Sequence, residues 1–207
     1  RPEDVVPNPK TGKVYVMLTK NRKRKSANAA NKRANNRFGH IIEITEQDNE
    51  HSATSGYWDT VVECGDPDNP DHDAQWNQAT SENGWFVCPD NGVIDSQGRL
   101  WISTDQDSKK THLSGTADGL WGLETEGPRR GTGKMFYRVP KGAELCGPCF
   151  SEDEETLFLA VQHPGDYEKS EEEIAMGGKI NWPDFEAGQP PRPSIVTVRK
   201  RGGGTIG

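Results

Sequence analysis

Three acidic residues stand at similar places in three parts of the sequence and could bind one metal centre together. Glu3 and Asp90 each follow a proline and precede a short apolar stretch, and Glu144 lies beside the corresponding point of a third stretch, two residues earlier when the segments are aligned. Carboxylate oxygens are the ligands that hard cations such as Ca²⁺ prefer. Without a cation, carboxylates held close together would raise one another's pKa. We therefore predict a metal site formed by Glu3, Asp90 and Glu144, although any one of them alone would be interpreted as an ordinary turn or strand-end acid.

Arg1 stands two residues before Glu3, so on a strand both side chains share a face. A guanidinium group beside bound metal ions can hold two oxygens of a phosphate at once. Arg1 is thus a candidate for both substrate binding and catalysis, and the alternative is a solvated arginine without a role.

Other motifs that could carry chemistry are incomplete. The acidic stretch at 66–73 fails as an EF-hand, because Pro70 and Asp71 occupy positions that need a ligand and a glycine. Cys146 and Cys149 form a single C-x-x-C without the second pair of a zinc ribbon, and residues three apart on a strand point to opposite faces. Cys64 and Cys88 are expected to be buried thiols or one disulfide. No P-loop and no serine-hydrolase elbow is present.

The elements that must position the acids are short strands. Clusters of β-branched and aromatic residues alternate with turn sequences at 8–12, 95–98 and 151–155. This plan recurs in three repeats, at about 1–64, 85–140 and 144–200. Repeated antiparallel units of this kind are typical of β-propeller blades, whose inner strands surround an axis. The predicted fold class is all-β, part of a β-propeller of about two and a half blades with long loop insertions.

The number of repeats indicates that other parts are needed. Propellers generally close with four to eight blades, so two full blades and a partial one cannot form a ring. We expect residues 1–207 to be the C-terminal portion of a single propeller domain, completed by a further N-terminal part.

Composition agrees with thin sheets and wide loops. Only 31% of the 207 residues are hydrophobic, while 23 are Gly and 14 are Pro, which argues against a helical bundle. No stretch approaches the roughly 20 apolar residues of a membrane helix. The net charge is −7, but residues 20–37 hold eight basic residues and no acid. This segment lacks interleaved aromatic residues and is predicted to be a solvated loop, so we expect neither a nucleic-acid partner nor a membrane.

Considered together, these segments resemble the PhoX family of bacterial alkaline phosphatases, in particular the C-terminal part of such proteins. The resemblance rests on the order of several stretches: R-P-E-D (1–4), N-P-K-T-G-K-V-Y-V (8–16), N-R-F-G-H-I-I-E-I (36–44), C-P-D-N (88–91), D-S-Q-G-R-L-W-I-S-T-D (95–105), G-A-E-L-C-G-P-C-F-S (142–151), T-L-F-L-A-V-Q-H-P-G (156–165), W-P-D (182–184) and P-R-P-S-I-V (191–196).

The resemblance implies a six-bladed propeller that is periplasmic or secreted and hydrolyses phosphate monoesters with the help of Ca²⁺ and Fe³⁺. It places Glu3, Asp90 and Glu144 on metal-ligand positions and Arg1 on a phosphate-binding position. The export signal and the part of the family that supplies further ligands, including a cysteine bound to iron, are not expected in this chain.

Two other functions fit the same residues. A calcium-dependent propeller lactonase or esterase would also place acidic and amide ligands on the axis, and Asn91 beside Asp90 would suit it. A non-catalytic propeller would use the carboxylates to hold a structural ion and would serve as a binding module.

Overall fold

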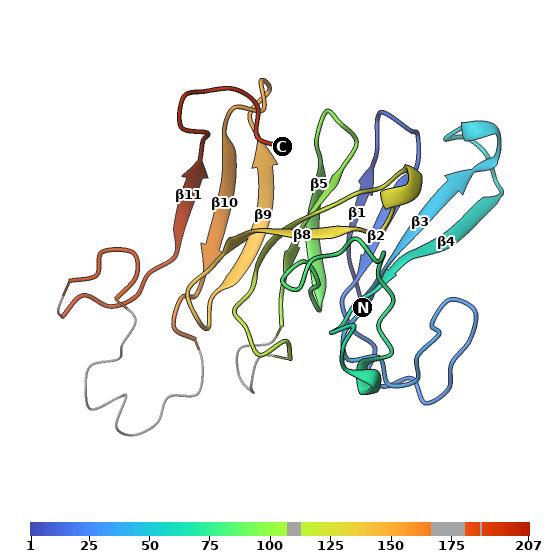
Figure 1. Ribbon diagram of the computed structural model, residues 1–207, viewed down its shortest axis with the longest axis horizontal. Coiled ribbons are helices and arrows are strands. Elements are labelled where there is room, and N and C mark those ends of the chain that lie inside the picture. The colour runs from blue at the N-terminus through green and yellow to red at the C-terminus, as the bar shows by residue number, and fades with distance from the viewer. Residues whose placement is uncertain (107–112, 167–180, 187) are drawn as a thin grey trace.

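The computed structural model describes residues 1–106, 113–166, 181–186 and 188–207, and their regular structure consists almost entirely of antiparallel strands. Three sheets stand side by side (Figure 1). The first has the order β1-β2-β3-β4, with β1 (Pro2–Pro7), β2 (Val14–Leu18), β3 (His40–Glu46) and β4 (Gly56–Glu63). The second has the order β5-β6-β7-β8, with β5 (Pro89–Ile94), β6 (Leu100–Thr104), β7 (Gly119–Leu123) and β8 (Gly133–Arg138).

The third sheet has three strands in the order β9-β10-β11, with β9 (Glu144–Phe150), β10 (Leu157–Gln162) and β11 (Ser194–Val198). Three single turns of 3₁₀ helix lie in the connections, at Gln47–Asn49, Pro70–His72 and Gly127–Arg129. Two four-stranded sheets and one three-stranded sheet confirm the predicted fold class. In the described part of the chain, no helix is long and apolar enough to cross a membrane.

The first strands of the three sheets are neighbours, with β5 between β1 and β9. The backbone N–H of Gly92 on β5 donates to Asp4 on β1 (3.0 Å), and the N–H of Gly147 on β9 donates to Asn91 on β5 (3.0 Å). Gly92 permits this close approach, because a Cβ atom there would lie 2.8 Å from the terminal carbon of Met17. The inner strands β1, β5 and β9 thus lie side by side and are joined by hydrogen bonds.

The hairpin turns that end the inner strands are also joined from sheet to sheet. Asn8 donates to the carbonyl oxygen of Gly98 (3.0 Å), and the hydroxyl of Ser96 donates to the carboxylate of Glu154 (2.7 Å). Because all three turns meet at one end, the starting residues of β1, β5 and β9 must meet at the opposite end. The sequence had placed its candidate acids at these starting residues.

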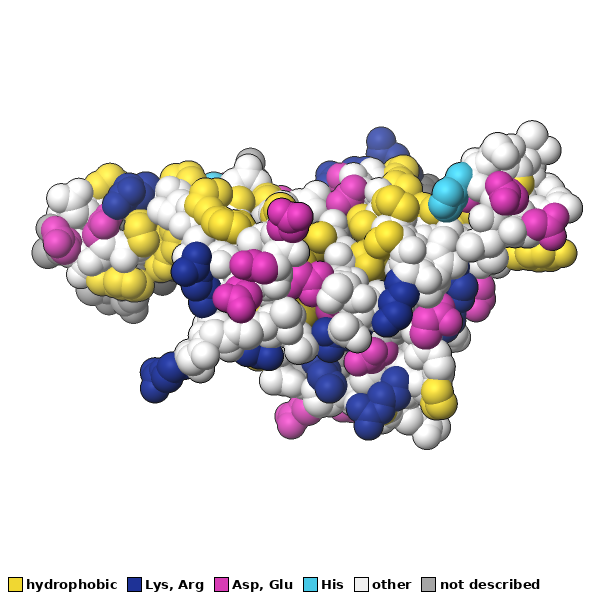
Figure 2. Space-filling view, turned by 90° about the horizontal axis from the view of Figure 1, so that it is seen from above, with side chains coloured by type: hydrophobic (Ala, Val, Ile, Leu, Met, Phe, Trp, Pro, Cys, Tyr) yellow, Lys and Arg dark blue, Asp and Glu magenta, His cyan; other side chains and the backbone are white. Residues whose placement is uncertain are grey.

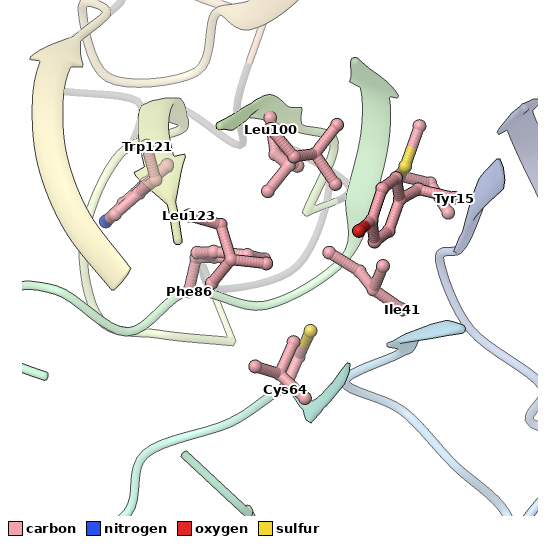
Figure 3. Packing of buried hydrophobic residues seen from close by; sticks show 10 residues of the cluster. Tyr15, Ile41, Cys64, Phe86, Leu100, Trp121 and Leu123 are labelled. Carbon is pink, nitrogen blue, oxygen red and sulfur yellow. The ribbon is translucent and has the colours of Figure 1, made fainter. Parts of the chain in front are cut away.

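Two apolar layers hold the sheets together, one on each side of the second sheet. Strand β6 is buried along its whole length, and its alternate residues point to opposite faces. Leu100 and Ile102 pack into the layer against the first sheet (Figure 3), whereas Trp101 packs into the layer against the third. Burial on both faces explains why this strand is a continuous apolar run rather than an alternating one.

The basic segment 20–37 is only partly the solvated loop that its composition predicts. Arg33 is buried and donates to the carbonyl oxygens of Cys64 (2.6 Å), His72 (2.8 Å) and Gly39, and it pairs with the buried carboxylate of Glu63 at 3.1 Å. Arg33 thus joins the basic segment to residues 64–72. The sequence also predicts a long loop at 165–193, and part of this range lies outside the described residues.

The four cysteines are free thiols in the structure. Cys64 and Cys88 are buried thiols, which is one of the two alternatives predicted for them. Cys146 is half-buried and Cys149 is exposed.

Candidate metal and phosphate site

The candidate site lies at the starting ends of β1, β5 and β9, where the inner strands bring Glu3 and Glu144 within electrostatic range of Asp90. Asp90 is the most enclosed, with 7% of its surface exposed. Burial raises the pKa of Asp90 to about 7, and the nearby charges of Glu144, Glu3 and Asp105 act in the same direction. The structure therefore brings Glu3 and Glu144 near Asp90, and their charges oppose the ionisation of Asp90.

Arg1 supplies positive charge at the same end. Its guanidinium group pairs with Glu3 and reaches Asp105 on the second sheet, with Nη2 lying 3.4 Å from Oδ2. Partial burial lowers the pKa of Arg1, but the hydrogen bond with Glu3 and the charges of Glu3, Asp105 and Asp90 outweigh it, so the pKa is raised. Arg1 is held between two carboxylates and keeps its charge.

Glu144 is held by two other side chains. Its Oε2 lies 3.2 Å from Nε2 of His163, and its Oε1 lies 3.0 Å from Sγ of Cys146. Gln162, the last residue of β10, faces Glu144 across the strand pair and donates to the same sulfur at 3.2 Å.

The donor set fits a hard cation, since it consists of carboxylate oxygens, one of them buried with its pKa raised. As the side chains stand, the described residues contain no group of three or more His, Cys, Asp or Glu close enough to hold a metal ion. The carboxylate of Glu3 is turned to Arg1, and that of Glu144 to His163 and Cys146. In this arrangement the three carboxylates do not lie close enough to share one ion, although their oxygens keep lone pairs that could bind a cation.

Sequence reasoning missed three side chains at this end, namely Asp105, Cys146 and His163. Asp105 directly follows β6, next to the start of β5 that carries Asp90, and this position at the end of a strand is the signal that could have identified Asp105. Cys146 had been considered only as half of a C-x-x-C. His163 directly follows β10, but no spacing motif distinguishes it from the other histidines.

Comparisons with known proteins indicate the family of the chain. Over its whole length the chain superimposes on a solved structure described as Pseudomonas fluorescens PhoX in complex with vanadate, a transition-state analogue, with a TM-score of 0.84 and 29% sequence identity. The chain covers 34% of that protein's length. A search of curated proteins gave no match.

The sequence itself matches the family described as alkaline phosphatase PhoX over residues 1–165. PhoX phosphatases are metalloenzymes. With a match over most of its length, and with the three-sheet architecture of a propeller segment, the chain belongs to the PhoX alkaline phosphatase family.

Proposed function

We propose that this chain provides part of the active site of a metal-dependent alkaline phosphatase that hydrolyses phosphate monoesters and releases inorganic phosphate. The observation that carries the proposal is the convergence of Glu3, Asp90 and Glu144 beside a charged Arg1, in a chain that belongs to the PhoX family. The vanadate in the Pseudomonas fluorescens protein supports phosphoryl chemistry in a relative.

In this proposal, Glu3, Asp90 and Glu144 hold the cations, for which Ca²⁺ and Fe³⁺ are the candidates. Bound cations supply Lewis-acid polarisation of the phosphoryl oxygens. Arg1 binds two oxygens of the phosphoryl group and stabilises the charge that builds up on them during transfer. Asp105 keeps the guanidinium group of Arg1 directed toward the site from the second sheet.

The remaining part of the propeller is proposed as the structural partner. Large apolar side chains are exposed on the outer faces of the two end sheets: Val5 and Trp58 on the first, and Phe158 and Ile195 on the third. Beside Tyr57 and Trp58 the first sheet has an apolar hollow of about 300 Å³. Figure 2 shows apolar side chains gathered at the end of the molecule that carries the third sheet. The complete ring is proposed to have six blades, and the blades that this chain does not contain would cover these faces. The family resemblance also predicts a periplasmic or secreted location.

The test uses the full-length protein in parallel assays with p-nitrophenyl phosphate and a simple lactone, together with elemental analysis for calcium and iron. We expect phosphate release that vanadate inhibits and that is lost on chelation. Hydrolysis of the lactone alone would favour the lactonase, and metal binding without either reaction would favour a binding module. Either result would overturn the proposed function.

A further inference from the structure

Glu144 is fixed by contacts on both of its carboxylate oxygens, and neither contact comes from the other candidate ligands. His163 Nε2 lies 3.2 Å from Oε2, and the Cys146 thiol lies 3.0 Å from Oε1. The side chain of Glu144 is largely buried (16% exposed), and that of His163 is partly exposed (36%). An ionised carboxylate only accepts hydrogen bonds, so both neighbours must act as donors.

The histidine is itself held in place. Its Nδ1 lies 3.3 Å from the carbonyl oxygen of Gly142 and 3.9 Å from the carboxylate of Asp166. Its backbone has φ of 32°, a left-handed value that costs energy for a residue with a side chain. Strain of this kind persists where the surrounding contacts fix the residue.

The cysteine is also supported as a donor. A neutral thiol is a weak hydrogen-bond donor, and the Cys146 thiol lies 3.0 Å from Oε1 of Glu144. The side-chain amide of Gln162 donates to the same sulfur at 3.2 Å. Cys149 takes no part, because its thiol is directed to the carbonyl oxygen of Phe150 (3.5 Å). The two cysteines of the C-x-x-C therefore have separate surroundings: Cys146 contacts Glu144 and Gln162, whereas Cys149 is exposed.

We propose that His163 and Cys146 are positioning residues that orient the carboxylate of Glu144 for metal binding, with His163 the stronger of the two. The inference rests on the proposed role of Glu144 as a ligand. Each carboxylate oxygen has two lone pairs, so an oxygen can accept from His163 or Cys146 and still bind a cation. Hydrogen-bonded supports of this type around metal ligands change metal affinity by about 10- to 100-fold when they are removed.

The experiment compares metal binding by the full-length protein and its variants, measured as calcium and iron per chain after equilibration with graded chelator. His163→Ala should lower metal affinity by about 10- to 100-fold. His163→Gln, which keeps an N–H donor of similar reach, should restore most of it, and Cys146→Ala should have a smaller effect than His163→Ala. His51→Ala is the matched control, since His51 forms an exposed pair with Glu46 away from the site.

Two further variants separate this inference from the proposed function. If Glu144→Gln loses metal while His163→Ala keeps wild-type affinity, the positioning role is wrong and the ligand role stands. If Glu144→Gln keeps its metal, the ligand role fails. Adding His163→Ala to Glu144→Gln should lower metal affinity no further, because both act through one carboxylate; an additive loss would show that His163 does not act through Glu144.

Discussion

The carboxylate of Asp90 on β5 lies within electrostatic range of that of Glu144 on the adjacent inner strand β9. Burial of Asp90 and the neighbouring charge of Glu144 together raise the pKa of Asp90 to about 7. Glu3 on β1 contributes in the same direction, and Arg1 opposes it. A cation bound beside Asp90 would stabilise its ionised carboxylate and so offset this shift.

Replacing Arg1 should impair phosphate recognition more than folding. Arg1→Ala removes the one guanidinium group proposed to stabilise charge on the phosphoryl oxygens. We expect kcat/KM for p-nitrophenyl phosphate to fall by about 10²- to 10³-fold, with weaker inhibition by vanadate. Arg192→Ala is the control, because Arg192 forms an exposed ion pair with Asp184. Unchanged vanadate inhibition in a metal-loaded Arg1→Ala protein would exclude the role.

Breaking the buried pair of Arg33 and Glu63 should destabilise the protein strongly. Arg33→Ala leaves the Glu63 carboxylate buried without its partner and deprives three carbonyl oxygens of a donor. The free energy of unfolding in urea should fall by about 3–5 kcal/mol. The double variant Arg33→Met with Glu63→Gln should recover much of the loss. A single variant as stable as the wild type would mean that the pair contributes nothing.

A second buried acid gives the metal-free protein a defined pH dependence. Burial raises the pKa of Asp118 to about 7, against an ordinary value of 3.8, although Thr104 (2.5 Å) and the N–H of Gln106 (3.2 Å) donate to it and lower the pKa. Between pH 4 and 7 the unfolded chain ionises this group while the folded protein keeps it protonated. Unfolding then releases a proton, so stability falls as pH rises.

The size of this effect is set by the shift, at about 1.4 kcal/mol per pKa unit, so the loss across the window is at most about 4 kcal/mol. Urea unfolding of the metal-free protein at pH 5 and pH 8 measures it. Asp118→Asn should reduce the difference, since an amide does not titrate in this range, and the pH dependence that remains should come from Asp90, whose pKa is also raised to about 7. An equally steep pH dependence in Asp118→Asn would assign the effect to other groups.

The strands could be predicted from sequence because burial leaves a local signature. Leu100–Ile102 is an apolar run that follows turn residues, and it lies in a strand, Leu100–Thr104, that is buried on both faces. Arg33 could not be predicted in the same way, because its partners lie on other segments and its neighbours in sequence are exposed or only partly buried basic residues.

In the candidate site, too, some residues could be predicted from the sequence and others could not. Glu3, Asp90 and Glu144 recur at repeat starts, so their convergence follows once the inner strands are aligned. Asp105 directly follows β6 and His163 directly follows β10, the second strands of their sheets. Only the pairing of strands in the fold brings Asp105 beside Arg1 and His163 beside Glu144.

The most direct test of a metal-dependent site at the inner strands is elemental analysis and phosphatase assay of the full-length Asp90→Asn protein. The same change in Asp153→Asn, at an exposed turn of the third sheet, is the matched control. We predict that Asp90→Asn loses bound metal and hydrolysis of p-nitrophenyl phosphate together, while Asp153→Asn keeps both. Full metal content and full activity in Asp90→Asn would contradict the account.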